Sequence, residues 1–248
     1  MRAGTVNPTT LAVSLLAVLV FAVAAGCGAS EEASSEASEA GAVAQAATDV
    51  DDKGAMEESA EEGNETVTAT LTKIAGEKGS GGPREQVEVE YLPAGKKVAT
   101  LETTKGVVRF ELWEDQVPNT VINFVHLANS GRYDGVEFHR VIEGFMAQTG
   151  DVAHQGGYGG PGYSIPAEFN PELKHVRGVV SMARSQDPDS AGSQFFIMYV
   201  SHTGLDGQYA AFGKVFEGMD VIDALNKGEP PAEPDKIVKL RVASIAGE

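Results

Sequence analysis

The sequence contains almost no cysteine. Cys27 is the single cysteine among 248 residues, so no disulfide can form within the chain. The sequence also lacks any repeat with a period of 20–50 residues, which excludes an array built from such repeats. Folding must therefore rely on a hydrophobic core, and hydrophobic residues make up 42% of the chain, enough to build one.

Basic residues are scarce as well. The chain has 19 Lys and Arg against 36 Asp and Glu, and its formal net charge is −17. Without a basic stripe, this charge argues against a nucleic-acid partner. The five histidines do not cluster at metal-ligand spacing, so no metal site is expected. The glycine-rich run 156–162 lacks the Gly-Lys-Ser/Thr ending of a phosphate-binding loop, and we expect a flexible loop beside a substrate site instead.

The first 26 residues have the pattern of an export signal. Residues 11–25 are apolar apart from Ser14. This run is shorter than the roughly 20 residues of a membrane-spanning helix and suits a secretory signal. Ala24-Ala25-Gly26 then lead into Cys27, which resembles the bacterial lipobox, although Ala24 stands where that motif usually has Leu. The resemblance implies that Cys27 is lipidated. A plain secretory signal, or a short anchor with an incidental cysteine, is the alternative.

Residues 27–66 are predicted to be a disordered acidic tether. From residue 28 to residue 66 there are twelve acidic residues, one basic residue and no aromatic residue, so little apolar surface is available for burial. Residues 67–95 are ambiguous. Two runs, 66–72 and 86–92, alternate like strands around a glycine-rich stretch. They form either an extra hairpin or a loosely ordered extension.

Residues 96–248 carry the clearest structural pattern. Alternation over 98–103 and 107–113 predicts a hairpin, and Pro118 opens a helix that ends at Gly131. A second short helix is expected over 219–226. Further short strands are expected at 136–142, 146–150, 178–182, 194–199, 211–215 and 236–245. We predict a mainly β fold, a closed antiparallel eight-stranded barrel capped by two α-helices.

One predicted hairpin brings a cation next to apolar side chains. A three-residue turn at 143–145 would place Arg140 opposite Gln148 and Ile142 opposite Met146, with all four on one face. A guanidinium beside Met and Phe makes a mostly apolar pocket with one fixed donor. Such a pocket suits a proline ring and its peptide bond.

Long motifs add a family resemblance. They are Phe138-His139-Arg140-Val141-Ile142-Glu143-Gly144-Phe145-Met146-Ala147-Gln148-Thr149-Gly150-Asp151, Ser181-Met182-Ala183-Arg184, Gly192-Ser193-Gln194-Phe195-Phe196-Ile197, Leu205-Asp206-Gly207 and Phe212-Gly213-Lys214-Val215. Over about residues 98–245 the chain resembles the cyclophilins. The resemblance implies a peptidyl-prolyl cis-trans isomerase that needs no cofactor or metal, with Arg140 as the catalytic donor and Gln148 orienting it. The implied substrate-binding residues are His139, Phe145, Met146, Gln148, Ala183, Arg184, Gln194, Phe196, Leu205 and Tyr209.

Some positions depart from the best-known eukaryotic members. Gly204 stands where those members have a Trp that contacts cyclosporin, which predicts weak inhibition by this drug. Tyr209 replaces a His and Arg184 replaces an Asn. The expected partners are flexible proline-containing polypeptides and, through Cys27, the outer face of a bacterial cell membrane. The chain is expected to act as a monomer. A non-catalytic proline-peptide binder or holdase on the same barrel is the alternative function.

Overall fold

The computed structural model describes residues 66–76 and 81–245. The predicted export signal, Cys27 and the acidic tether up to residue 65 lie outside these residues. The strands are β1 Val67–Ala75, β2 Arg84–Tyr91, β3 Lys96–Thr103, β4 Gly106–Leu112, β5 Arg140–Ile142, β6 Met146–Thr149, β7 Tyr163–Ser164, β8 Val179–Met182, β9 Phe195–Met198, β10 Ala211–Glu217 and β11 Ile237–Ile245. The helices are α1 Pro118–Asn129 and α2 Met219–Asp223, with 3-10 turns at Pro188–Ser190 and Thr203–Leu205. Within the described ranges, no helix combines the length and apolarity needed to cross a membrane.

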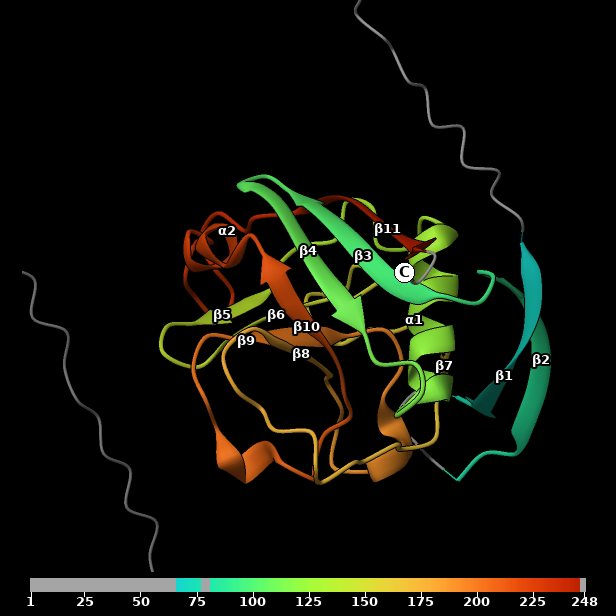
Figure 1. The fold of residues 1–248 in the computed structure, drawn as a ribbon. Coiled ribbons are helices and arrows are strands. Elements are labelled where there is room, and N and C mark those ends of the chain that lie inside the picture. The colour runs from blue at the N-terminus through green and yellow to red at the C-terminus, as the bar shows by residue number, and fades with distance from the viewer. Residues whose placement is uncertain (1–65, 77–80, 246–248) are drawn as a thin grey trace, which may run out of the picture. The chain divides into compact units, whose positions relative to one another are not determined.

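Eight strands form one curled antiparallel sheet in the order β11-β3-β4-β10-β8-β9-β6-β5 (Figure 1). The mainly β fold with eight strands in this sheet and two helices is confirmed, whereas the closed barrel is not. In the described part of the chain no ladder joins β5 to β11. The segments where these strands begin are nevertheless bonded: Glu137 and Lys236 form an isolated bridge, and the N–H groups of Phe138 and Ile237 donate to the carbonyls of Asp235 and Val136, each at 2.8 Å. The outer edge of β5 is already occupied, because Val141 exchanges two backbone hydrogen bonds with Gly228, at 2.8 and 2.9 Å.

Helix α1 begins and ends where the sequence predicts. Pro118 occupies its first turn, where a missing N–H costs nothing, and Gly131 follows it with a φ of 73°. A carboxylate from a distant loop caps the free amides: Glu168 accepts hydrogen bonds from the N–H groups of Asn119 and Thr120, at 3.1 and 2.6 Å. A negative charge at a helix N-terminus is stabilising.

The core of the molecule is an aromatic cluster around Phe124 of α1. Its ring centroid lies 5.0–5.9 Å from those of Phe110, Tyr133, Phe195 and Phe212. All five side chains are buried, and each can contribute roughly 1.5–3 kcal/mol by leaving water. The sheet and α1 are therefore joined through one closely packed centre.

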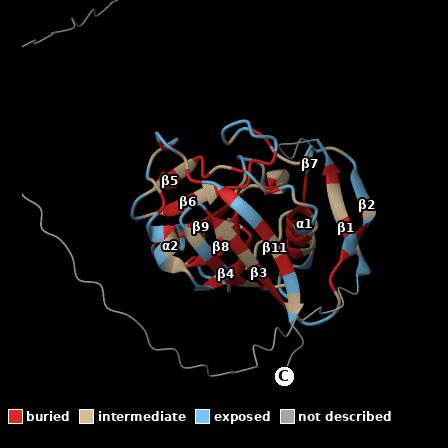
Figure 2. Ribbon diagram, turned by 90° about the horizontal axis from the view of Figure 1, so that it is seen from above, coloured by how far each residue is buried: buried red, intermediate tan, exposed pale blue. Residues whose placement is uncertain are grey.

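Strands β1 and β2 pair as an antiparallel hairpin, and β1 also pairs with β7, which completes a separate three-stranded sheet. The sequence left this point open. Helix α1 packs between β11 and this hairpin. Strand β2 is the outer edge of the small sheet and is mostly exposed, whereas Leu71 and Ile74 of β1 are buried (Figure 2).

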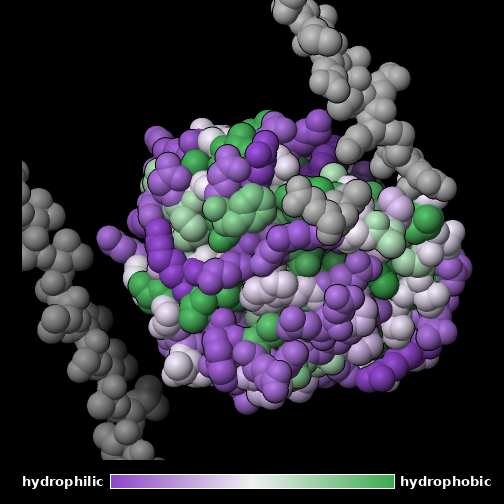
Figure 3. Space-filling model, viewed as in Figure 1, coloured by the Kyte–Doolittle hydropathy of each residue, from purple (hydrophilic) through white to green (hydrophobic). Residues whose placement is uncertain are grey.

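The surface mixes apolar and polar side chains. On the face shown in Figure 3, hydrophobic residues form small patches separated by hydrophilic ones. Phe216 and Val238 are among the exposed apolar residues. Exposure of this kind is ordinary for a globular surface.

Candidate active site

The hairpin β5–β6 has the predicted register. Arg140 lies opposite Gln148, and Ile142 lies opposite Met146. The turn closes with a hydrogen bond from the Phe145 N–H to the Ile142 carbonyl, at 3.1 Å, and Gly144 takes a φ of 70° that favours glycine. The register agrees with the prediction that these four residues share one face, and three of them, Arg140, Met146 and Gln148, line the same cavity.

That cavity, called here the first cavity, has a volume of about 270 Å³. Its apolar lining comes from strands β6 and β9 and from the loops that flank them. It brings together nine of the predicted residues: Arg140, Phe145, Met146, Gln148, Ala183, Arg184, Phe196, Leu205 and Tyr209. Met146 and Phe196 are almost fully buried, so they form the floor of an apolar site that is open at one side.

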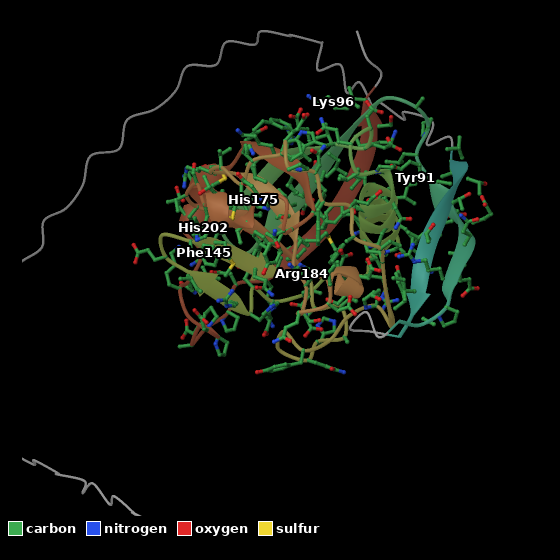
Figure 4. The ribbon with its side chains drawn as sticks, turned by 90° about the horizontal axis from the view of Figure 1, so that it is seen from below. Tyr91, Lys96, Phe145, His175, Arg184 and His202 are labelled. Atoms are coloured by element: carbon green, nitrogen blue, oxygen red, sulfur yellow. The ribbon has the colours of Figure 1, made fainter. Side chains whose placement is uncertain are left out.

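The aromatic wall of the first cavity is supported by ring contacts. Phe196 packs edge-on against Tyr209 with centroids 5.8 Å apart, and His175 stacks behind Phe196 at 6.2 Å. Phe145 lies beside His202 at 5.4 Å, and both are seen together in Figure 4. Met146 and Phe196 belong to an apolar cluster that is distinct from the core around Phe124.

Arg140 is oriented by a residue that the sequence did not identify. Its Nε donates to the Glu229 carboxylate at 3.2 Å, while its side chain remains 39% exposed. The resemblance implied that Gln148 would orient Arg140, but the Gln148 Nε2 donates instead to Gln194 Oε1 at 2.9 Å. Glu229 lies 89 residues further along the chain and is brought there by the pairing of Gly228 with Val141, so no local pattern indicates it.

Gln194 lies in a second cavity next to the first. Its Nε2 donates to the carbonyls of Gly157 and Gly159, at 2.9 and 2.8 Å, so it holds the glycine-rich loop 156–162. The second cavity has a volume of about 280 Å³ and shares Gln148, Ala183 and Arg184 with the first. The predicted loop beside a substrate site therefore forms a wall of this cavity.

The carboxylate of Asp151 fixes the same glycine-rich loop. Its buried carboxylate accepts four backbone hydrogen bonds, at 2.7–3.2 Å, from Ala153, Gln155, Gly157 and Gly159. Asp151 closes the first sequence motif, but nothing in its neighbourhood in the sequence indicates that it organises a loop.

Arg184 lies at the junction of the two cavities. Its guanidinium contacts the rings of Tyr209 and Phe169, 4.7 and 5.4 Å from their centroids. Its Nε donates to the Gln208 carbonyl at 2.9 Å. Figure 4 shows it away from the group formed by Phe145, His175 and His202. A peptide that passes from one cavity to the other would meet this side chain.

His139 is the one predicted residue that lines neither cavity. It faces a smaller space of about 170 Å³ shared with Asp151 and His154. Its ring lies against Gly157: a Cβ atom added to Gly157 would lie only 2.6 Å from the imidazole of His139. Burial lowers the pKa of His139. The structure therefore places His139 behind the glycine-rich loop. It packs against this loop and does not line the edge of the first cavity.

A Ser–His–Asp arrangement lies behind the first cavity. His175 Nε2 is 3.0 Å from Ser181 Oγ, and His175 Nδ1 is 3.2 Å from Asp206 Oδ1. Ser181 is fully buried within β8, so no substrate carbonyl can reach its hydroxyl. Burial also lowers the pKa of His175, which favours the neutral ring. We interpret the three residues as a hydrogen-bonded support for Phe196.

Comparisons with known proteins agree with this geometry. Residues 98–242 match a family model described as "Cyclophilin type peptidyl-prolyl cis-trans isomerase/CLD". The chain is 46% identical over 158 residues to a probable peptidyl-prolyl cis-trans isomerase of Brucella suis, covering 57% of this chain and 80% of that protein. It is 42% identical over 150 residues to a peptidyl-prolyl cis-trans isomerase of Synechococcus elongatus, covering 60% and 97%.

Solved structures give the same result. A cyclophilin type peptidyl-prolyl cis-trans isomerase of Cryptosporidium parvum matches with a TM-score of 0.56 and 33% identity, covering 60% of this chain and 99% of that one. A crystal structure of the same protein in the presence of the dipeptide Ala-Pro matches with a TM-score of 0.54 and 34% identity.

Proposed function

We propose, on the premise that this chain belongs to the cyclophilin-type peptidyl-prolyl cis-trans isomerase family, that it accelerates rotation of X–Pro bonds in exported polypeptides. One observation carries the proposal: the guanidinium of Arg140 lines the same cavity as Phe145, Met146 and Phe196. The presence of Ala-Pro in a related crystal structure supports proline peptides as the ligands of this cavity.

The chemistry requires one donor near the prolyl nitrogen. Rotation of an X–Pro bond must cross a barrier of about 18–20 kcal/mol, because amide resonance is lost. In the twisted transition state the prolyl nitrogen regains a lone pair and becomes a hydrogen-bond acceptor. A donor aimed at that nitrogen binds the transition state better than either planar ground state, and this difference accelerates the reaction.

Arginine suits this task better than any other donor. Its guanidinium stays protonated and holds its N–H groups in a rigid plane. Because Nε of Arg140 is held by Glu229, we propose that the terminal amino groups face the substrate. A charge-assisted hydrogen bond of this kind contributes about 1.5–3 kcal/mol, or more in a site from which water is excluded.

The other predicted residues then have two roles. Phe145, Met146, Phe196, Leu205 and Tyr209 would enclose the proline ring in the first cavity. Ala183 and Arg184, at the junction, and Gln194, in the second cavity, would contact the backbone that precedes proline.

The test is turnover of a proline peptide in a protease-coupled assay by the full chain in detergent. Arg140→Ala should lower kcat/KM by about 10²-fold or more, because it removes the transition-state donor. Arg109→Ala is the matched control, since Arg109 also pairs with a glutamate, Glu217, at 3.2 Å but on the far strands β4 and β10. A wild-type chain that binds proline peptides without turnover would support the holdase alternative and refute the proposal.

The proposed location rests on the sequence alone. The apolar run 11–25, the following Cys27 and the acidic residues 28–66 support a lipid-anchored protein whose tether holds the enzyme away from a membrane. The mass of the mature N-terminus isolated from membranes tests this. A diacylated Cys27 is expected, and Cys27→Ser should release the chain; an unacylated terminus would refute the anchor and leave the enzyme proposal intact.

A further inference from the structure

The β1–β2 hairpin precedes the family match, which begins at residue 98, yet it is built into the same core. Leu71, Val89 and Tyr91 are buried in the cluster that contains Phe124. A reciprocal pair of hydrogen bonds fixes the hairpin to α1: the Thr72 N–H donates to Asn119 Oδ1 at 2.7 Å, and Asn119 Nδ2 donates to the Thr72 carbonyl at 3.1 Å. The hairpin is therefore a firmly attached part of the domain.

One side of the hairpin holds the loop that leads out of the glycine-rich run. Strand β1 pairs with β7, with Ile74 opposite Ser164 and Ala75 opposite Tyr163. The ammonium group of Lys73 lies 4.4 Å from the centroid of the Tyr163 ring. Such a contact contributes about 0.5–1 kcal/mol at an exposed site. Tyr163 itself lines the second cavity, so the hairpin bonds directly to one wall of that cavity.

The other strand of the hairpin holds a neighbouring segment, which pairs with the first through a backbone hydrogen bond from the Ile165 N–H to the Ala191 carbonyl at 2.7 Å. Arg84, the first residue of β2, forms an ion pair with Asp189 at 3.1 Å. Asp189 also accepts a hydrogen bond from the Ala167 N–H, at 2.8 Å, and it lies in the 3-10 turn 188–190. Ser190, the last residue of this turn, lines the second cavity, as does Ser185, whose N–H donates to Ser190 Oγ at 2.9 Å.

Tyr163 adds a second connection between the two adjoining segments. Its hydroxyl donates to Asn123 Oδ1 at 2.8 Å, and Asn123 Nδ2 donates to the Gly192 carbonyl at 2.7 Å. Gly192 also lines the second cavity. The hairpin lines neither cavity itself, but it bonds to both adjoining segments in the wall of the second cavity and to no residue that lines only the first.

We propose that the β1–β2 hairpin is a positioning element that fixes one wall of the second cavity and so selects substrates by the residues that precede the X–Pro bond. This inference rests on the proposed isomerase function. Arg84 and Lys73 are its positioning residues: neither lines a cavity, and they act through their contacts with Asp189 and Tyr163. The hairpin should therefore affect the binding of extended peptides and leave bond rotation unchanged.

The test compares two peptides on the full chain in detergent. One is blocked immediately before the X–Pro pair, and the other extends three residues further toward its N-terminus. Arg84→Ala should raise KM for the extended peptide by about two- to fivefold, the size expected from losing an exposed ion pair. It should leave kcat for both peptides, and KM for the short one, unchanged. Arg84→Lys should restore most of the loss, because the charge remains.

Arg109→Ala is the matched control, because Arg109 forms an ion pair of similar exposure with Glu217 on β4 and β10. A second measurement is amide hydrogen exchange. Exchange at Ala167, whose N–H bonds to Asp189, should become faster in Arg84→Ala and remain unchanged in Arg109→Ala. Equal effects on both peptides, or none, in an active wild-type enzyme would overturn the inference. A wild type inactive on both peptides would instead refute the proposed function.

Discussion

The two neighbouring cavities are built from different kinds of structure. The first takes its donor and floor from strands β5, β6 and β9, whose register places Arg140, Met146 and Phe196. The second is walled largely by loops, and its shape depends on Asp151, Gln194 and the hairpin ion pair of Arg84. A cavity held by strand ladders should be insensitive to remote changes, whereas one held by side-chain contacts should be adjustable.

This difference fits a division of roles between the cavities. In the proposed mechanism, transition-state stabilisation needs one donor held in a fixed geometry, which short paired strands provide. Discrimination among polypeptides needs a wall that can vary without disturbing that donor. Because the two cavities share Gln148, Ala183 and Arg184, a substrate can occupy both at once.

The largest expected effect comes from removing the carboxylate of Asp151, which holds the glycine-rich loop in the wall of the second cavity. Asp151→Ala leaves four backbone N–H groups without their acceptor. Only the bond from Gly159 is fully buried, so water can replace part of what the other three N–H groups lose. A buried donor without a partner costs about 1–3 kcal/mol, and we expect the free energy of unfolding to fall by about 2–3 kcal/mol. Urea unfolding measures this loss.

Activity shows which cavity the loop serves. At a temperature where Asp151→Ala remains folded, kcat/KM for the extended peptide should fall more than kcat/KM for the short one. The exposed Asp115→Ala is the control for loss of a carboxylate. Equal losses on both peptides would mean that the glycine-rich loop also supports the first cavity, and the contrast between the cavities would fail.

The sequence predicts the local geometry correctly where that geometry follows from neighbouring residues. The turn at Gly144 and strand alternation were sufficient to place Arg140 opposite Gln148, and Pro118 and Gly131 marked the bounds of α1. The roles given to the pocket residues came from the family resemblance.

Contacts between distant segments were missed, because no local pattern encodes them. Glu229 reaches Arg140 across 89 residues, and Glu168 caps α1 across 48 or 49. Closure of the sheet into a barrel, which the short strands and two helices predict, is not confirmed, because no ladder joins β5 to β11 in the described residues, although the segments where these strands begin are bonded through Glu137 and Lys236.

A smaller effect should appear on lowering the pH. Burial lowers the pKa of His175, behind the first cavity, of His139, behind the second, and of His126 on α1. Below about pH 6.5 these histidines are therefore protonated more readily in the unfolded chain than in the folded protein. The free energy of unfolding should fall as the pH drops through this range. Each histidine contributes a slope of at most about 1.4 kcal/mol per pH unit.

Urea unfolding between pH 7.5 and pH 5 measures this slope. His175→Gln and His139→Gln should each reduce the change of unfolding free energy with pH. The larger reduction identifies the histidine whose burial contributes more to this change. The exposed Gln155→Asn, which changes no titratable group, is the control and should leave the slope unchanged. Stability of the wild type that does not change over this range would contradict the prediction.

The smallest expected effect concerns the partner of Arg140. Glu229→Gln keeps a hydrogen-bond acceptor at Nε but removes the charge from a pair that is largely exposed. Exposed ion pairs contribute about 0.2–1 kcal/mol, so kcat should fall by about two- to threefold with KM unchanged, and the difference from wild type should shrink at high salt. Glu217→Gln, which removes the partner of Arg109, is the matched control. A rise in kcat would mean that the carboxylate competes with substrate for the guanidinium, because a freed donor would then face the prolyl nitrogen more often. In that case the first cavity, like the second, would be adjusted by a contact from a distant loop.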